Sequence, residues 1–89
     1  MLTPDYTNRF LKDYKQVIKR NYNILLIDAI LKDLIDEKPL AAKHKDHPLV
    51  GNYAGCRECH ILPDWLLIYQ VGNGVIVFER TGTHSDLYR

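Results

Sequence analysis

The chain has 89 residues, of which 46% are hydrophobic and 26% charged. This length allows one domain over residues 1–89, and this composition excludes a disordered or fibrous protein. The formal net charge of +1 argues against a protein that holds nucleic acid by a strong global field. Nine of the twelve cations precede residue 46, which allows a local basic face, although any one lysine is more simply the solvated side of a helix.

The first residues, M-L-T-P-D-Y, form neither a basic nor an apolar leader. The apolar run at residues 24–27 is far too short to span a bilayer. We therefore expect a soluble, cytoplasmic protein that makes no contact with a membrane.

Two amphipathic helices are expected in the first half of the chain. Residues 2–5 include a proline and can form a short strand at a sheet edge. Thr7 can cap a helix that runs to about Arg20, and Asn23 can cap a second helix that ends before Pro39. Because the connection between them is short, the two helices should lie antiparallel.

The second half is expected to form a loop and then a sheet. Residues 38–49 show no sustained period and read as an ordered loop. Three strands follow, at residues 53–62, 65–71 and 75–81, with turns at Pro63-Asp64 and at the G-N-G of 72–74. The last five residues are too few to assign. The predicted class is α+β, with two antiparallel N-terminal helices packed on an antiparallel β-sheet.

The segment C-R-E-C-H at 56–60 matches the c-type haem attachment pattern, and it also resembles half a zinc site or a redox pair. If this segment is a strand, Cys56 and Cys59 point to opposite faces and cannot share a metal or a disulfide without distortion. No second C-x-x-C is present, and the one methionine is Met1. We expect two reduced thiols, no metal and no cofactor.

The four histidines all lie outside the predicted helices, at His44, His47, His60 and His84. Imidazole titrates near neutral pH, and a well-placed acid or base contributes about 10²–10⁴ in rate. The simpler interpretation is a set of scattered surface residues, and composition alone does not decide between the two.

Arg80 and Trp65 are further candidates for a site. Arg80 lies in the last predicted strand, where it must find an anion: Glu58, Glu79, Asp64 or a bound phosphate. Trp65 either stacks on a base or fills the core, and for a tryptophan that begins an apolar strand the core is favoured.

Four ordered blocks resemble one known family. They are K-D-H-P-L at 45–49, the G-x-R-x-x-H formed by Gly55, Arg57 and His60, P-D-W-L-L-I-Y at 63–69, and F-E-R-T-G-T-H at 78–84. These blocks, over most of the chain, resemble the RelE/ParE superfamily of bacterial type II toxins, and within it the YafQ-like messenger-RNA interferases.

The resemblance implies a RelE-like fold and a ribosome-dependent endoribonuclease that needs no metal. A ribose 2′-hydroxyl attacks the adjacent phosphate, which leaves a 2′,3′-cyclic phosphate and a 5′-hydroxyl. By resemblance the catalytic residues are His47, His60, Asp64, Arg80 and His84, and those that bind RNA or support the site are Trp65, Tyr88, Lys43 and Lys45. We expect His84 to be the general acid, Asp64, His47 or His60 the base, and Arg80 the group that neutralises the phosphorane.

The resemblance also implies partners. These are a cognate antitoxin protein, the 70S ribosome with its messenger RNA, and operator DNA that is reached only through the antitoxin. The alternative from the same superfamily is a ParE-like toxin that binds gyrase and cuts no RNA. Fold alone does not separate the two, but a gyrase inhibitor has no need of the histidine set together with Asp64.

Overall fold

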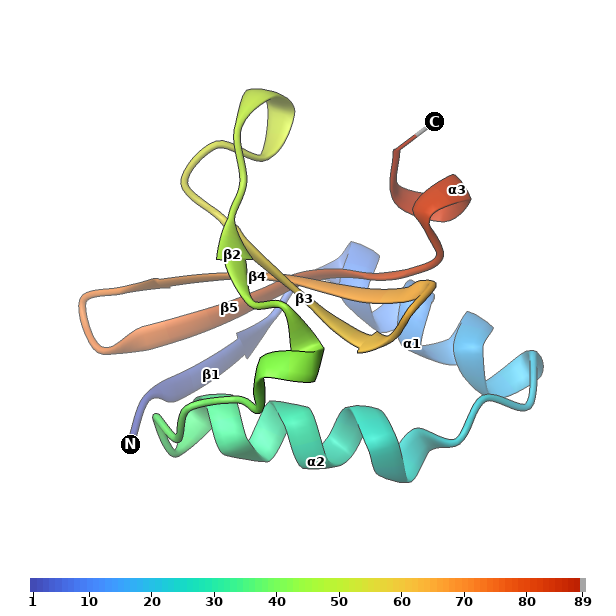
Figure 1. Ribbon diagram of the computed structural model, residues 1–89, viewed down its shortest axis with the longest axis horizontal. Coiled ribbons are helices and arrows are strands. Elements are labelled where there is room, and N and C mark those ends of the chain that lie inside the picture. Colours follow the sequence, from blue (N-terminus) through green and yellow to red (C-terminus); the bar gives the residue numbers. More distant parts are fainter. Residues whose placement is uncertain (89) are drawn as a thin grey trace.

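The computed structural model describes residues 1–88, and Figure 1 shows helices lying against one face of a twisted five-stranded sheet. In chain order the elements are β1 (Thr3–Tyr6), α1 (Asn8–Lys19), α2 (Ile24–Ile35), η1 (Ala42–His44), β2 (His47–Pro48), η2 (Gly51–Tyr53), β3 (Arg57–Leu62), β4 (Trp65–Gly72), β5 (Val75–Gly82) and α3 (His84–Leu87). The strand order is β1-β5-β4-β3-β2. The predicted α+β class is confirmed.

The sheet is mixed, and this corrects the prediction that it is antiparallel throughout. β1 is an edge strand as expected, but it runs parallel to β5, whereas all other pairs are antiparallel. Local signals favoured hairpins only, because a pairing between the first and last strands leaves no turn in the sequence.

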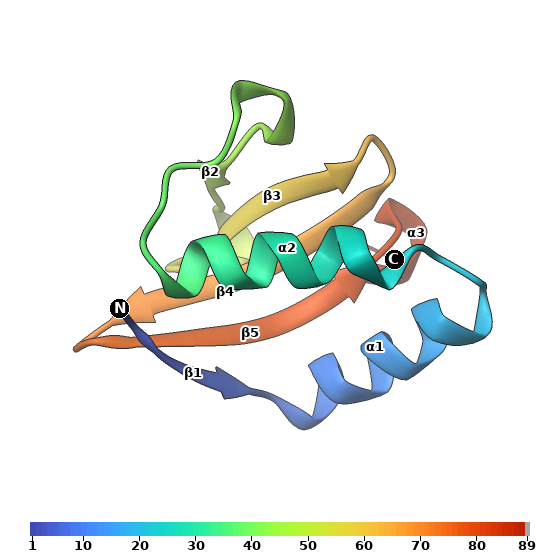
Figure 2. The same ribbon diagram turned by 90° about the horizontal axis from the view of Figure 1, so that it is seen from below.

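Both predicted helix caps are present. The Thr7 hydroxyl accepts a hydrogen bond from the backbone N–H of Phe10 at 3.0 Å, and the Asn23 side chain accepts one from that of Leu25 at 3.1 Å. Each cap satisfies an N–H that the first helical turn leaves without a partner. Figure 2 shows α1 and α2 running in opposite directions as a splayed pair, with α1 beside β5 and α2 across the sheet.

The main core fills the space between these helices and the sheet. Its buried side chains include Phe10, Val17, Ile27, Trp65 and Phe78, none of which is more than 2% exposed. Burying one such side chain contributes roughly 1.5–3 kcal/mol, so this layer dominates the stability of the fold. We call this side of the sheet the helix face.

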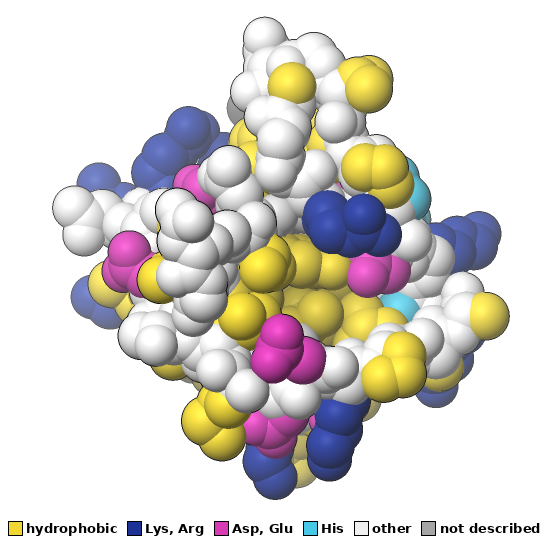
Figure 3. All heavy atoms as spheres, turned by 90° about the vertical axis from the view of Figure 1, so that its left-hand side faces the viewer, with side chains coloured by type: hydrophobic (Ala, Val, Ile, Leu, Met, Phe, Trp, Pro, Cys, Tyr) yellow, Lys and Arg dark blue, Asp and Glu magenta, His cyan; other side chains and the backbone are white. Residues whose placement is uncertain are grey.

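The opposite side, which we call the site face, carries a smaller cluster. Cys56, Leu66, Ile68 and Leu87 are buried there, under short segments rather than long helices. At the end of the sheet near the N-terminus, Figure 3 shows a hollow with apolar side chains, where core residues of the helix face, such as Leu34, Tyr69 and Ile76, line a cavity of about 310 Å³. No helix in the described part of the chain is long and apolar enough to cross a membrane.

The hairpin turn predicted between the second and third strands of this sheet is present. Asn73 and Gly74 both have positive φ, 54° and 77°, as a two-residue hairpin turn requires. The strand predicted from residue 53 is wrong at its start: residues 51–53 form η2, and β3 begins only at Arg57. Gly51 and Gly55, at φ of 72° and 90°, bend the chain out of the sheet. The predicted loop at 38–49 contains η1 and the two-residue strand β2.

Candidate active site

Three histidines and a tyrosine form a row on the site face. Ring centroids lie 6.3 Å apart for His47 and His60, 5.8 Å for His60 and His84, and 6.4 Å for His84 and Tyr88. His60 pairs across the strands with Leu66, a member of the smaller cluster, which places it on this face. Four segments meet here: β2, β3, the start of α3 and the residue after α3. We call these four side chains the histidine row.

His84 is held by Asp64, as the motif resemblance had grouped them. Asp64 Oδ1 lies 2.5 Å from His84 Nδ1 and also accepts the backbone N–H of His84 at 2.9 Å. These bonds lower the pKa of the Asp64 carboxyl, the backbone bond most. A carboxylate at Nδ1 keeps the proton on that nitrogen when the ring is neutral, so Nε2 is the atom that exchanges protons with a substrate.

His60 is held in the same tautomer, but by a backbone carbonyl instead of a carboxylate. Its Nδ1 lies 3.2 Å from the carbonyl oxygen of Pro63, which can only accept, so the neutral ring carries its proton on Nδ1. Nε2 then has a free lone pair. His44, which matched no role in the family blocks, lies behind it: its Nδ1 contacts the His60 carbonyl oxygen at 2.7 Å. The row therefore contains two neighbouring rings that each present Nε2 for proton exchange, and of these two only His84 has a carboxylate partner.

Glu58 joins the two ends of the row and was missed as a site residue. Its side chain is 8% exposed; Oε2 lies 3.1 Å from His47 Nε2, and Oε1 accepts the phenol hydrogen of Tyr88 at 3.1 Å. Burial and Glu58 raise the pKa of Tyr88, so this phenol is a hydrogen-bond donor rather than a base. Glu58 precedes His60 by two residues in β3, and this strand alternation was the signal that could have found it.

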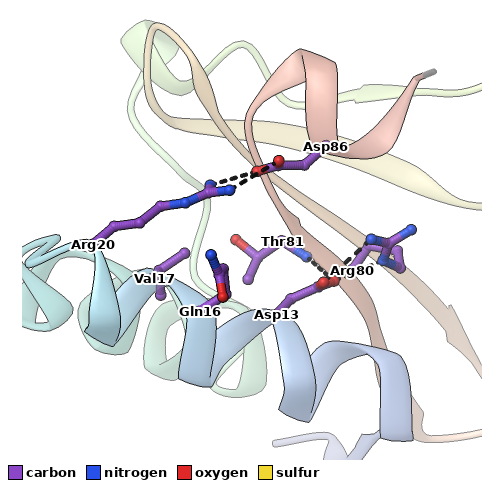
Figure 4. Close-up of a pocket in the computed structure, with 7 residues that line it drawn as sticks. All are labelled: Asp13, Gln16, Val17, Arg20, Arg80, Thr81 and Asp86. Atoms are coloured by element: carbon purple, nitrogen blue, oxygen red, sulfur yellow. Dashed lines mark hydrogen bonds and ion pairs between the residues drawn. The ribbon is translucent and has the colours of Figure 1, made fainter.

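Arg80 lies beside the row and not within it. Its Nε and Nη2 contact the carboxylate of Asp13 on α1 at 2.6 and 3.2 Å, and Asp13 also accepts the backbone N–H of Thr81 at 3.2 Å. This pair, shown in Figure 4, raises the pKa of Arg80. The expected anion among Glu58, Glu79 and Asp64 is therefore corrected to Asp13. Tyr53, whose ring is 5.8 Å from that of Tyr88, donates its hydroxyl hydrogen to the carbonyl oxygen of Leu87 at 3.4 Å.

The remaining candidates differ in exposure: the two lysines line an open cavity, whereas the tryptophan is buried. Lys43 and Lys45 line a cavity of about 330 Å³ that also includes His60. Trp65 is 2% exposed, and its indole N–H donates to the Thr81 hydroxyl at 3.0 Å. Of the two roles expected for Trp65, only support of the site suits so buried a side chain.

The two cysteines lie on opposite faces of the sheet. Cys59 belongs to the main core, whereas Cys56 belongs to the cluster on the site face. The thiols therefore cannot share a metal, a haem or a disulfide. Within residues 1–88 no three histidine, cysteine or acidic side chains are grouped to hold a metal ion.

The family model described as "Bacterial toxin of type II toxin-antitoxin system, YafQ" matches residues 2–89. The chain belongs to the YafQ family. The mRNA interferase toxin YafQ of Escherichia coli K12 is 40% identical to it over 85 residues, which cover 94% of this chain and 92% of that protein.

Solved structures agree with this membership of the YafQ family. The crystal structure of YafQ from E. coli BL21(DE3) has a TM-score of 0.95 at 37% identity, and a chain in the crystal structure of the E. coli DinJ-YafQ complex has 0.93 at 38%; both cover 100% of either chain. The resemblance drawn from the four sequence blocks is confirmed. The gyrase-binding alternative finds no support in these relatives.

Proposed function

We propose that this YafQ-family toxin is a messenger-RNA endoribonuclease that cuts messages on the translating 70S ribosome, in the cytoplasm, and so stops protein synthesis. The observation that carries the proposal is the His84–Asp64 pair beside His60, because it sets a proton donor next to a proton acceptor on one open face. The E. coli relative, named an mRNA interferase toxin, supports the same activity.

The reaction needs two proton transfers. A base removes the proton of a ribose 2′-hydroxyl, and the 2′-oxygen then attacks the adjacent phosphorus. The bond from phosphorus to the 5′-oxygen breaks, and an acid protonates that oxygen. The products are a 2′,3′-cyclic phosphate and a 5′-hydroxyl, with no net change in protons. This displacement requires a base that reaches the 2′-hydroxyl and an acid that reaches the 5′-oxygen of the same phosphate.

His84 is the acid in this scheme, since Asp64 holds Nδ1 and directs Nε2 outward. Of the three candidates for the base, Asp64 is already committed to His84, and its lowered pKa makes it a weak proton acceptor. His60 presents a free Nε2 and, unlike His84, has no carboxylate partner, so it is our choice for the base. His47 faces acceptors at both nitrogens, Lys45 O at 2.6 Å and Glu58 Oε2 at 3.1 Å, so neither nitrogen is free to take a proton from a substrate.

Cations near the row supply the remaining charge. Arg80 is held by two hydrogen bonds to Asp13, and in this scheme it neutralises the phosphorane. Lys43 and Lys45 hold the RNA backbone next to His60. Because the net charge of the whole chain is only +1, binding rests on this local patch, and we expect it to weaken steeply with salt.

The proposed partners follow from family membership. A cognate antitoxin binds and neutralises this toxin, as the E. coli DinJ-YafQ complex indicates for its relative. The antitoxin, not this chain, brings the complex to operator DNA.

The test uses ribosomes programmed with a defined message. The wild type is compared with His84→Ala, His60→Ala and Asp64→Asn, and the control is Asp5→Asn, which changes an exposed aspartate of β1. Cleavage is followed in a single turnover, with 5′ ends mapped and product termini identified. We expect cuts ending in cyclic phosphate and 5′-hydroxyl, slowed about 10²–10⁴-fold by either histidine change and unaffected in the control.

A contrary result is equally clear. Growth arrest by all three site variants, with no new 5′ ends from the wild type, contradicts the nuclease proposal and returns the gyrase-binding toxin to consideration.

A further inference from the structure

The acid of the proposed reaction sits on a very short helix. His84 is the first residue of α3, which has four residues and ends at Leu87. A single turn is not stable by itself, because nucleating a helix costs more than one turn of hydrogen bonds returns. The position of His84 must therefore come from contacts outside α3.

Asp86 joins α3 both to the residue that caps it and to α1. It accepts the backbone N–H of Thr83 at 2.9 Å, while the Thr83 hydroxyl accepts that of Asp86 at 3.1 Å, which completes a capping box. The same carboxylate receives Nη1 and Nη2 of Arg20 at 2.6 and 3.1 Å (Figure 4). This fork, opposed by burial, holds the pKa of Asp86 well below its ordinary value.

Arg20 connects α3 to the C-terminal end of α1, a helix that packs beside β5. It follows the last residue of α1, and Asp13, which holds Arg80 and the backbone of Thr81, lies seven residues earlier on that helix. Residues two turns apart lie on one face of a helix. One face of α1 thus holds the chain both before and after Gly82, around a cavity of about 230 Å³.

Gly82 lies where β5 joins α3, and its surroundings show how closely this junction is packed. Its φ is 156°, and a Cβ placed there would lie 2.8 Å from Asp86 Oδ2. Any larger residue must push the Asp86 carboxylate away from Arg20 or from the cap of α3. The junction therefore depends on the place of that carboxylate as well as on its charge.

We propose that Arg20 is a positioning residue for the acid: by holding Asp86 it fixes α3, and so keeps His84 against Asp64 in the orientation that cleavage needs. This inference rests on the proposed function. Arg20 touches neither His84 nor Asp64 and acts only through Asp86 and the capping box. Because a misplacement of about 1 Å can cost about 10²-fold in rate, its removal should act on turnover more than on binding.

The experiment compares Arg20→Met with Lys19→Met in the full chain. Lys19 is the neighbouring exposed cation of α1, so both changes remove one charge and leave a long apolar side chain. On programmed ribosomes we expect Arg20→Met to slow the saturated single-turnover rate by about 10–100-fold and to leave the half-saturating concentration within about twofold. Lys19→Met should match the wild type in rate. Arg20→Lys, which keeps the charge but not the fork, should lie between them.

A second readout does not use cleavage. Nitrogen-15 NMR of the His84 ring should show one tautomer, protonated on Nδ1, for the neutral ring in the wild type and in Lys19→Met, and a mixture in Arg20→Met. Gly82→Ala, which alters no charge, should reproduce both effects. Denaturant unfolding confirms that every variant is folded under the assay conditions.

The two readouts separate the possible failures. If Arg20→Met behaves as Lys19→Met does in rate and in the His84 signals, the positioning role is wrong. It is also wrong if the slower rate only follows a loss of folded protein. If the wild type cuts no message, the proposed function fails, and the NMR comparison alone decides the role of Arg20.

Discussion

The two faces of the sheet are built by different means. The helix face is a continuous apolar layer under two helices of 12 residues each, and its large side chains are almost fully buried. The site face has a small apolar cluster, and its short segments are joined by polar contacts: Asp64 with His84, Glu58 with His47 and Tyr88, and Arg20 with Asp86. Folding stability comes mainly from the first face, and the chemistry proposed for this protein is placed on the second.

This contrast explains how so small a protein keeps reactive groups exposed. The side chains of His84 and Asp64 are 55% and 66% exposed, so they contribute little burial of their own. Their geometry depends on directional hydrogen bonds, each of which holds one atom in place but adds only about 0.5–1.5 kcal/mol. On the site face these hydrogen bonds therefore fix the positions of the side chains, although they are not the main source of folding stability.

The largest expected effect separates the two faces directly. Phe78→Ala removes a side chain with no exposed area from the helix face and should lower the free energy of unfolding by about 3–5 kcal/mol. His84→Ala, on the site face, should lower it by much less while slowing cleavage about 10²–10⁴-fold. Urea unfolding measures both. Comparable destabilisation by the two variants contradicts the division of roles.

A smaller effect should appear with pH. The pKa of Asp86 is lowered in the folded protein, mainly by Arg20, so its contribution is complete above the unfolded value of about 4 and is lost as pH falls through the folded value. Wild-type stability should decrease below pH ~4 by about 1.5–3 kcal/mol more than that of Asp86→Asn, which has no proton to gain. Unfolding in guanidinium chloride from pH 6 to pH 2 gives both curves, and parallel curves would count against the ion pair.

The smallest effect concerns the two thiols. Burial raises the pKa of Cys59, on the helix face, to about 12, and it also raises that of Cys56, which is 9% exposed on the site face. Both should react slowly with a thiol reagent near neutral pH, because the thiolate is the reactive form. We expect Cys56 to react at least ~10-fold faster, since the site face opens more readily. In Cys56→Ser only Cys59 can react, so this variant identifies the slower signal. If Cys59 is labelled first in the wild type, the expectation is wrong.

Local chemistry was enough to predict much of this protein. Thr7 and Asn23 cap their helices because a short polar side chain just before a helical apolar pattern can accept a hydrogen bond from a free N–H of the first turn. Asn73-Gly74 forms a hairpin turn because both residues tolerate positive φ. The histidines His47, His60 and His84 were recognisable with Asp64 from their motifs, and the structure brings these four side chains together.

Contacts between distant residues were decided only by the tertiary structure. The parallel pairing of β1 with β5, the partner of Arg80, and the hold of Arg20 on Asp86 join residues far apart in the chain; the two ion pairs span 67 and 66 positions. A carboxylate such as Asp13 looks like any solvated helix residue in the sequence, since its meaning depends on which strand lies beside it. Helix periods and turns are set by neighbours along the chain, whereas the partner of a charge is set by the packing that brings two faces together.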